Sequence, residues 1–287
     1  MKKKALHMIG KGLVCLISLV YILPVLFVAL QSLIPPEEIG ELYANAESEV
    51  YGLLLPRLLP RAISLRQYYE ILLAHSEYML SFWSSALLSL ECTAVCTGLA
   101  LLLGYVLTVS RFPLRQAVIR LIAVLMLLPW QAVMLPEYIL TRWMGLYDKR
   151  AALIVVQGMS SFSVFLMIQF MKGIPGELID AASLDTNSNI RVLMRVVCPM
   201  VVPGILACAV IAFSESWNML EQPMTLLENE ALYPMSVILY NINTEHIGIA
   251  FAGCAVYMVP IFVIWALFGD RVTQGLETAG RLGIGNE

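Results

Sequence analysis

The sequence predicts an all-α integral membrane protein with about six transmembrane helices. Of its 287 residues, 59% are hydrophobic and 14% are charged, whereas soluble domains average about 45–50% apolar and about 25% charged residues. The charges also leave long apolar runs between them, and a membrane-spanning helix needs about 20 such residues. A soluble chain of this size could not bury so much apolar surface. The composition therefore excludes a soluble enzyme, a disordered chain and a nucleic-acid binder.

Six stretches are long and apolar enough to cross a bilayer. Their expected bounds are 13–34, 80–109, 118–140, 151–171, 197–219 and 249–268. The first is longer than the roughly 7–15-residue core of a signal peptide, so we expect it to stay as a helix. The second exceeds one crossing and is expected to tilt or to extend beyond the bilayer. The six spans predict a single membrane domain over residues 1–287.

The basic residues indicate the orientation of the chain, because cytoplasmic loops carry an excess of Lys and Arg. With the N-terminus inside, the inner segments hold twelve Lys and Arg residues and the outer segments hold six. Both termini are therefore expected in the cytoplasm. The loop 142–150 fits this arrangement poorly, because it is an outer segment that carries Arg142, Lys149 and Arg150.

The sequence lacks the motifs of common catalytic and nucleotide sites. It has no P-loop pattern, and its three histidines (His7, His75 and His246) lie outside the predicted spans. Its six cysteines show no metal-ligand spacing. We therefore expect no catalytic residue, no metal site and no cofactor bound by this chain. Transport, channel, receptor and scaffold functions remain.

The segment 174–197 is the largest cytoplasmic feature between the predicted spans. Pro175 suits the start of a helix, and four residues share one face by helical spacing: Leu178, Ala181, Ala182 and Asp185. Residues 186–189 favour a turn. A second apolar stripe follows, made of Ile190, Leu193, Met194 and Val197. The pattern predicts a helix, a turn and a second helix, and taken alone it fits a loop lying on the membrane equally well.

This segment resembles the cytoplasmic loop of binding-protein-dependent ABC importer permeases. The family pattern is Glu-Ala-Ala, three residues, Gly, nine residues, Ile, one residue and Leu-Pro. Here it reads Asp180-Ala181-Ala182, three residues, Thr186, nine residues, Val196, one residue and Cys198-Pro199. The spacing is complete, but Asp, Thr, Val and Cys replace Glu, Gly, Ile and Leu. The loss of Gly matters most, because Gly supplies a turn conformation that Thr adopts poorly.

Other stretches are similar to the carbohydrate branch of this family, and to its maltose-type six-span permease subunit. They are 127–136, 145–148, 212–218 and 268–280. The resemblance implies a type I importer permease bundle in a bacterial cytoplasmic membrane, forming half of the pathway for a sugar or oligosaccharide. It implies a second permease subunit as a heterodimer partner, two ATPase subunits that use ATP and Mg, and an extracytoplasmic solute-binding protein. The loop would be a coupling helix that contacts the ATPase through Glu177, Asp180, Ala181, Ala182, Ser183, Leu184, Asp185, Thr186 and Asn187.

Polar side chains at membrane depth are candidates for the solute path, because such groups usually face a bundle interior or a cavity. Glu215, Trp217 and Asn218 cluster near the outer end of the fifth span. An acid, an aromatic face and an amide are the groups that sugar binding uses. The same residues also fit an aromatic belt and a helix–helix contact. Glu91 is expected to make a polar contact between helices.

Three other functions stay open at this point. A secondary transporter or channel working alone would need internal repeats and ionisable groups in the membrane centre. The sequence shows no clear repeat, and only Glu91, Glu137 and Glu215 are candidates for such groups. A membrane scaffold without transport, and an ABC permease for a solute other than a sugar, are the remaining alternatives.

Overall fold

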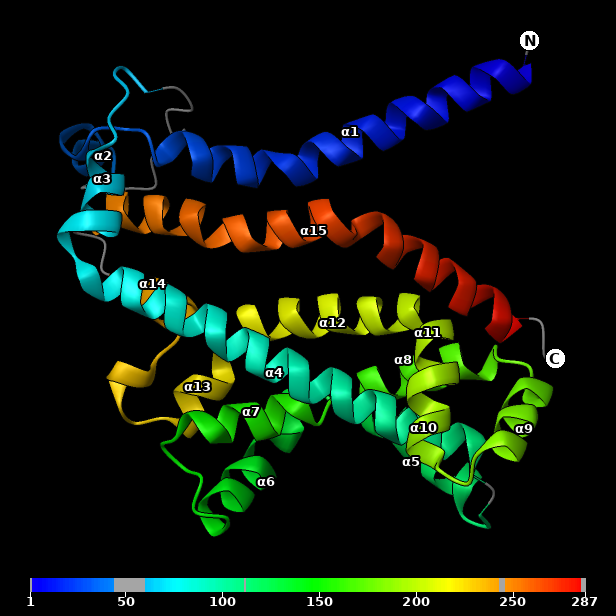
Figure 1. Cartoon of the computed structure of the whole chain (residues 1–287). Coiled ribbons are helices and arrows are strands. Elements are labelled where there is room, and N and C mark those ends of the chain that lie inside the picture. The colour runs from blue at the N-terminus through cyan, green and yellow to red at the C-terminus, as the bar shows by residue number, and fades with distance from the viewer. Residues whose placement is uncertain (1, 44–59, 111, 243–245, 285–287) are drawn as a thin grey trace. The chain divides into compact units, whose positions relative to one another are not determined.

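The computed structural model describes residues 2–43, 60–110, 112–242 and 246–284, and every regular element within these ranges is helical. Packing contacts divide the chain into two compact units (Figure 1). The first comprises Met1–Phe82 and Ile238–Val259, and the second comprises Trp83–Val237 and Pro260–Glu287. The expectation of a single membrane domain stays a prediction.

The first unit is built on two long apolar helices. Its helices are α1 (Lys2–Gln31), α2 (Pro36–Tyr43), α3 (Arg66–Tyr69), a π-helical turn (Glu70–Ala74), and the parts of α4 (Ser76–Val109), α14 (Met235–Tyr240) and α15 (Ile247–Ile284) that lie within its bounds. Phe27 of α1 meets Phe251 of α15 edge-on, with ring centroids 5.9 Å apart. Most apolar side chains of α1 are exposed, as expected where lipid supplies the apolar surroundings.

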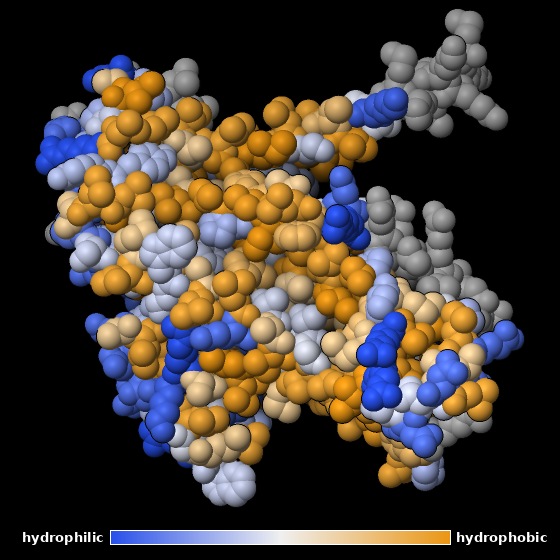
Figure 2. All heavy atoms as spheres, in the orientation of Figure 1, coloured by the Kyte–Doolittle hydropathy of each residue, from blue (hydrophilic) through white to orange (hydrophobic). Residues whose placement is uncertain are grey.

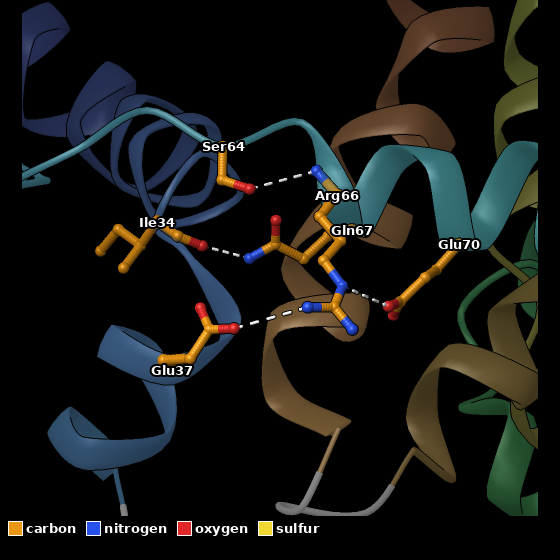
Figure 3. A network of polar contacts seen from close by, with 6 residues as sticks. All are labelled: Ile34, Glu37, Ser64, Arg66, Gln67 and Glu70. Carbon is orange, nitrogen blue, oxygen red and sulfur yellow. Dashed lines mark hydrogen bonds and ion pairs between the residues drawn. The ribbon is translucent and has the colours of Figure 1, made fainter.

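Polar contacts hold the short helices α2 and α3 at the end of α1 (Figure 3). Arg66 pairs with Glu70 at 3.3 Å and with Glu37 at 3.4 Å. The side chains of Arg66 and Glu37 are 62% and 75% exposed, and exposed ion pairs stabilise a fold by only about 0–1 kcal/mol. The side-chain amide of Gln67 donates to the carbonyl of Ile34, and Gln67 is buried. This buried bond is therefore the stronger anchor between α3 and the end of α1.

The second unit contains the remaining helices, arranged around a large apolar core and a smaller one. They are α5 (Arg115–Leu125), α6 (Trp130–Trp143), α7 (Arg150–Gly158), α8 (Ser161–Lys172), α9 (Gly176–Asp185), α10 (Asn189–Val192), a π-helical turn (Leu193–Val197), α11 (Cys198–Met200), α12 (Val202–Trp217), α13 (Glu221–Leu226) and a 3-10 turn (Glu230–Leu232). Fully buried residues of α8 and α12, such as Met167, Ile168, Ala207 and Cys208, lie at the centre of the large core.

Helices occupy all six predicted spans, which confirms the all-α membrane fold. Within the described residues, four helical stretches are long and apolar enough to span a membrane: 10–31, 76–109, 150–172 and 247–273. Two further spans are pairs of helices bent at a break, by 110° between α5 and α6 and by 84° before α12. Apolar side chains cover much of the visible surface in Figure 2, and hydrophilic residues gather in small groups.

The two bends interrupt the spans predicted over 118–140 and 197–219. The first break lies at 126–129 and ends at Pro129, whose backbone is extended. The second lies at Val201, two residues before Pro203. Proline has no N–H to donate, and it disfavours helical geometry in the residue before it. Each proline therefore lies close to the start of a new helix.

Candidate transport cavity and coupling segment

A cavity of about 680 Å³ lies within the second unit. Its walls come from the ends of several helices, because α5, α7 and α12 end there and α6, α8 and α13 begin there. The lining is half polar in character. Its polar and charged residues are Glu137, Gln157, Ser160, Ser161, Glu215, Asn218, Glu221 and Gln222. The cavity therefore offers hydrogen-bonding groups at membrane depth, where lipid offers none.

Two of the three predicted solute-path residues line this cavity. Glu215 and Asn218 lie three positions apart at the end of α12, so they share one face of the helix. Asn218 donates its side-chain amide to the carbonyl of Ser214 at 2.8 Å. Within the part of the chain that the structure describes, the carboxylate of Glu215 has no hydrogen-bond or ion-pair partner. It is therefore available to a solute.

The third predicted residue, Trp217, lies elsewhere. It is only 1% exposed and stacks on Phe213, with ring centroids 5.8 Å apart and planes 12° apart. It does not line the cavity. Positions two apart on a helix point in different directions, which explains why Trp217 separates from Glu215. The structure gives Trp217 a packing role.

A second part of the cavity wall comes from the start of α6, which the sequence analysis did not place in the solute path. The indole N–H of Trp130 donates to Glu137 at 3.1 Å, and both residues line the cavity. The side-chain amide of Gln131 donates to Glu221 at 3.3 Å. Seven positions separate Trp130 from Glu137, which is two helical turns and places them on one face. That spacing, together with the helix start after Pro129, is the feature of the sequence that could have indicated this part of the cavity wall.

The break between α7 and α8 places further polar groups in the cavity. Ser160 caps the start of α8 by accepting the backbone N–H of Ser163 at 3.3 Å. This cap satisfies a donor that has no partner within the helix. As a result, Gln157, Ser160 and Ser161 face the cavity.

Glu91 makes the interhelical contact that the sequence analysis expected. It pairs with Arg150 of α7 at 3.0 Å, and the same guanidinium donates to the hydroxyl and carbonyl oxygens of Ser84 at 3.1 and 2.9 Å. Both charged side chains are partly buried, at 29% exposed for Arg150 and 38% for Glu91. Arg150 therefore lies in the bundle, paired with an acid of α4, which explains why it fits poorly as an outer-loop charge.

The coupling segment forms the expected first helix, α9, and only part of its predicted face packs against the core. Ile179 and Ala182 pack against the core, while Leu178 and Leu184 are 46% and 90% exposed. Of the four residues that share the predicted face, Ala182 is the one that packs against the core. Two exposed leucines on a short polar helix form an apolar surface with no partner within the described residues.

The second helix of the segment differs for a related reason. Ile190 and Met194 are 72% and 59% exposed, whereas Val192, Leu193 and Val197 are buried. A π-helical turn over Leu193–Val197 replaces regular helix. Its hydrogen bonds close five residues apart, so it shifts which side chains face the core. The apolar stripe that assumed regular helical spacing is wrong at Ile190 and Met194.

Thr186 is tolerated where the family pattern has Gly. Its backbone is extended, with φ −156° and ψ 135°, and a β-branched residue adopts this conformation readily. Its hydroxyl accepts from the backbone N–H of Ser188 at 3.3 Å and from the guanidinium of Arg191 at 3.2 Å. Ser188 then caps the next helix by accepting the N–H of Arg191. Side-chain hydrogen bonds therefore hold this turn without a glycine.

The stretch 145–148, noted for its resemblance, joins the loop after α6 to the segment after α13. The carboxylate of Asp148 accepts the backbone N–H groups of Glu228 and Asn229, both at 2.8 Å. Tyr147 donates its hydroxyl to Glu228 at 2.9 Å. Arg142 lies over the ring of Tyr147, 4.3 Å from its centroid, and 3.9 Å from Glu228. The loop charges are therefore paired within the protein.

The hydrogen bonds from the backbone N–H groups of Asn229 and Glu228 lower the pKa of Asp148 from its ordinary value of 3.8, because they stabilise the charged carboxylate. The bond from Tyr147 to Glu228 raises the pKa of the Tyr147 hydroxyl, because it stabilises the protonated phenol. Both effects favour the joined arrangement at neutral pH.

Four apolar helices and two bent helix pairs that could each span a membrane, together with a polar cavity among them, indicate a multi-pass membrane protein. The chain belongs to the family described as binding-protein-dependent transport system inner membrane component, whose sequence profile matches residues 97–277. It is a permease component of an ABC transport system. This assignment agrees with the loop resemblance described above.

Several relatives are permeases named for carbohydrates. The chain is 24% identical to the arabinooligosaccharides transport system permease protein AraQ of Bacillus subtilis over 268 residues, 92% of each chain. It is 24% identical to the lactose transport system permease protein LacG of Rhizobium radiobacter, over 71% of this chain and 76% of LacG. A solved bacterial ABC transporter that imports the acidic polysaccharide alginate has the same fold, with a TM-score of 0.77 and 18% identity, covering 94% of this chain and 97% of that one.

Proposed function

We propose that this chain forms half of the translocation pathway of an ATP-driven importer for a sugar or oligosaccharide. The names of its relatives support a carbohydrate. A second permease subunit completes the pathway as a heterodimer, and an extracytoplasmic solute-binding protein delivers the solute. Two ATPase subunits bind ATP and Mg and hydrolyse ATP, so this chain binds no cofactor and has no catalytic residue. Both of its termini are cytoplasmic.

One observation carries this proposal: a continuous core connects the coupling segment to the cavity. Ile179 and Ala182 of α9 pack against the cluster formed by α8, α12 and the π-helical turn. The other ends of α8 and α12 supply Ser161 and Glu215 to the cavity. Protein cores are closely packed and transmit displacement. Movement of α9 on an ATPase would therefore move two helices that line the cavity.

The cavity suits a solute that must bind and then leave. Carboxylate, amide and hydroxyl groups can bond to sugar hydroxyls, and none of them forms a closed site around a fixed ligand. The family speaks against a secondary transporter working alone, because its members are components of binding-protein-dependent systems. One of the candidate acids for ion coupling, Glu91, is also already paired with Arg150.

The docking role of α9 is tested at Leu184. The substitution Leu184→Asp places a charge on a side chain that is 90% exposed, so the fold should tolerate it. If Leu184 contacts the ATPase, burying this charge without a partner should lower solute uptake at least tenfold and reduce co-purification of the ATPase. Uptake by whole cells and pull-down of the complex measure the two effects.

The matched control is Leu114→Asp, the same change at a side chain that is 66% exposed between α4 and α5. This variant should assemble and transport normally. The assignment of α9 as the docking element fails if Leu184→Asp retains both the ATPase and the wild-type rate of uptake.

A further inference from the structure

The charges that line the cavity are all negative. Glu137, Glu215 and Glu221 face it, and no Lys or Arg is among the described residues of its wall. Glu137 and Glu221 accept hydrogen bonds from neutral donors, Trp130 and Gln131. Among the residues that the structure describes, no cation pairs with the three lining carboxylates.

Two basic side chains at the ends of lining helices, Arg142 and Arg150, have partners outside the cavity. Arg142, at the end of α6, lies over the rings of Tyr138 and Tyr147 and near Glu228. Arg150, at the start of α7, is paired with Glu91. Neither guanidinium lines the cavity. A negatively charged solute would therefore find no counter-charge from these residues.

We propose that this cavity admits neutral saccharides and excludes anionic ones such as uronates, sulfonates and sugar phosphates. This proposal rests on the carbohydrate function proposed above and narrows its substrate class. The relatives do not decide the question, because they include permeases named for neutral sugars and a transporter for an acidic polysaccharide. The proposal rests instead on the carboxylates that this chain contributes to the cavity wall.

The physical basis is repulsion inside a partly enclosed space. A cleft lined by charges of one sign concentrates their field, and the apolar surroundings weaken screening by water. An anionic sugar would lose hydration on entry and gain no paired cation. A neutral sugar loses less free energy on leaving water, because Asn218, Gln157 and the glutamates can form hydrogen bonds with its hydroxyls. The ring of Trp130 offers an apolar face for the sugar ring.

A single cysteine in the cavity measures its charge preference directly. We would place Ser161→Cys in the assembled transporter, with the accessible cysteines Cys15, Cys198 and Cys254 changed to Ala. The buried Cys92, Cys96 and Cys208 stay in place. The new thiol is then treated with a cationic trimethylammonium methanethiosulfonate and with its anionic sulfonate analogue. The rate at which each reagent modifies the new thiol is divided by the rate at which the same reagent modifies free 2-mercaptoethanol, which corrects for the intrinsic reactivity of the two reagents.

The cationic reagent should be favoured on the order of tenfold over the anionic one after this correction. The double variant Glu137→Gln and Glu215→Gln should abolish most of that preference. Glu230→Gln, which removes an exposed charge that does not line the cavity, should leave the preference unchanged. Equal corrected rates in the wild-type cavity, or faster reaction with the anionic reagent, would overturn the proposal.

Uptake by the assembled transporter separates this proposal from the proposed function. Neutral trisaccharides, including arabinotriose, are compared with trigalacturonate. Uptake of a neutral sugar without uptake of trigalacturonate supports both proposals. ATP-dependent uptake of trigalacturonate would refute the charge selection and leave the carbohydrate function standing. If no saccharide is taken up, the carbohydrate function fails, and the reagent ratio still decides whether the cavity excludes anions.

Discussion

Asp148 shows how one side chain joins the loop before α7 to the segment after α13. Its φ of +56° lies in a region that few residues other than Gly adopt, although Asp and Asn tolerate it. The backbone N–H of Asp148 donates to Leu226 at 3.0 Å, while its carboxylate accepts from Glu228 and Asn229. The end of α13, whose first residues line the cavity, is thereby held to the loop before α7.

The hydrogen bonds of Asp148 predict a defined pH dependence. Because the folded pKa lies below the ordinary 3.8, the joint is fully stabilised above pH 3.8 and weakens as the pH falls through the folded pKa. Asp148→Asn keeps the backbone conformation but replaces charge-assisted bonds by weaker neutral ones. At pH 7, hydrogen-exchange protection of the Glu228 and Asn229 amides should fall several-fold in this variant.

Protection factors, which correct for the intrinsic pH dependence of exchange, are compared between pH 7 and pH 3. The difference between the wild type and Asp148→Asn should shrink as the pH falls below 3.8. The variant Asp180→Asn on α9 serves as the control and should leave these amides unaffected. A difference that is constant with pH would show that the charge of Asp148 does not hold the joint.

Individual site residues differed in how far the sequence could place them. Glu215 and Asn218 could be predicted because a polar pair three positions apart at the end of an apolar run must face something other than lipid. The spacing from Trp130 to Glu137 indicates a shared helical face, but the direction of that face depends on the backbone at the break that ends at Pro129. The fit of Thr186 depended on backbone angles that no sequence pattern gives.

At the scale of elements, apolar length predicted where the helices lie but not how strongly they bend. Apolar length predicts a span, whereas a bend of 110° between α5 and α6 depends on which backbone groups find other partners. The same holds for the π-helical turn before α11, which has no reliable sequence signature. These breaks are important for function, because several of them supply residues to the cavity wall.

Close packing between α4 and α7 gives a prediction at this scale. A Cβ added at Gly158 would lie 2.6 Å from Cγ1 of Val95, whose β-branched side chain has little freedom to move. We expect Gly158→Ala to lower the free energy of unfolding by about 1–3 kcal/mol. Thermal unfolding of the purified protein in detergent measures this loss.

Gly98 of α4 provides the matched control, because a Cβ there would meet no atom within 4 Å. Gly98→Ala should be neutral or stabilising by up to about 1 kcal/mol, since Ala favours a helix over Gly. Adding Val95→Ala to Gly158→Ala should recover part of the lost stability. Equal melting temperatures for Gly158→Ala and Gly98→Ala would contradict the close approach.

At the scale of the whole chain, hydropathy and charge predicted the fold class because the bilayer restricts a spanning chain to few solutions. A count of Lys and Arg residues in the loops does not show which of them form pairs. The count treated Arg142 and Arg150 as free outer charges. In the structure, Arg142 lies beside Glu228 and Arg150 pairs with Glu91. The ammonium of Lys149 donates to the carbonyl of Gly145 at 2.7 Å. These contacts remove the main objection to placing the loop 142–150 outside.

We therefore expect the turn after α13 to lie outside the cell and α9 to lie inside. Single cysteines at Glu230 and at Asp180, both exposed positions, test this in a background with Cys15, Cys198 and Cys254 changed to Ala. A membrane-impermeant thiol reagent should label Glu230→Cys in intact cells. It should label Asp180→Cys only after the membrane is permeabilised, because α9 must reach a cytoplasmic ATPase. The reverse pattern would invert the topology and, with it, the docking role of α9.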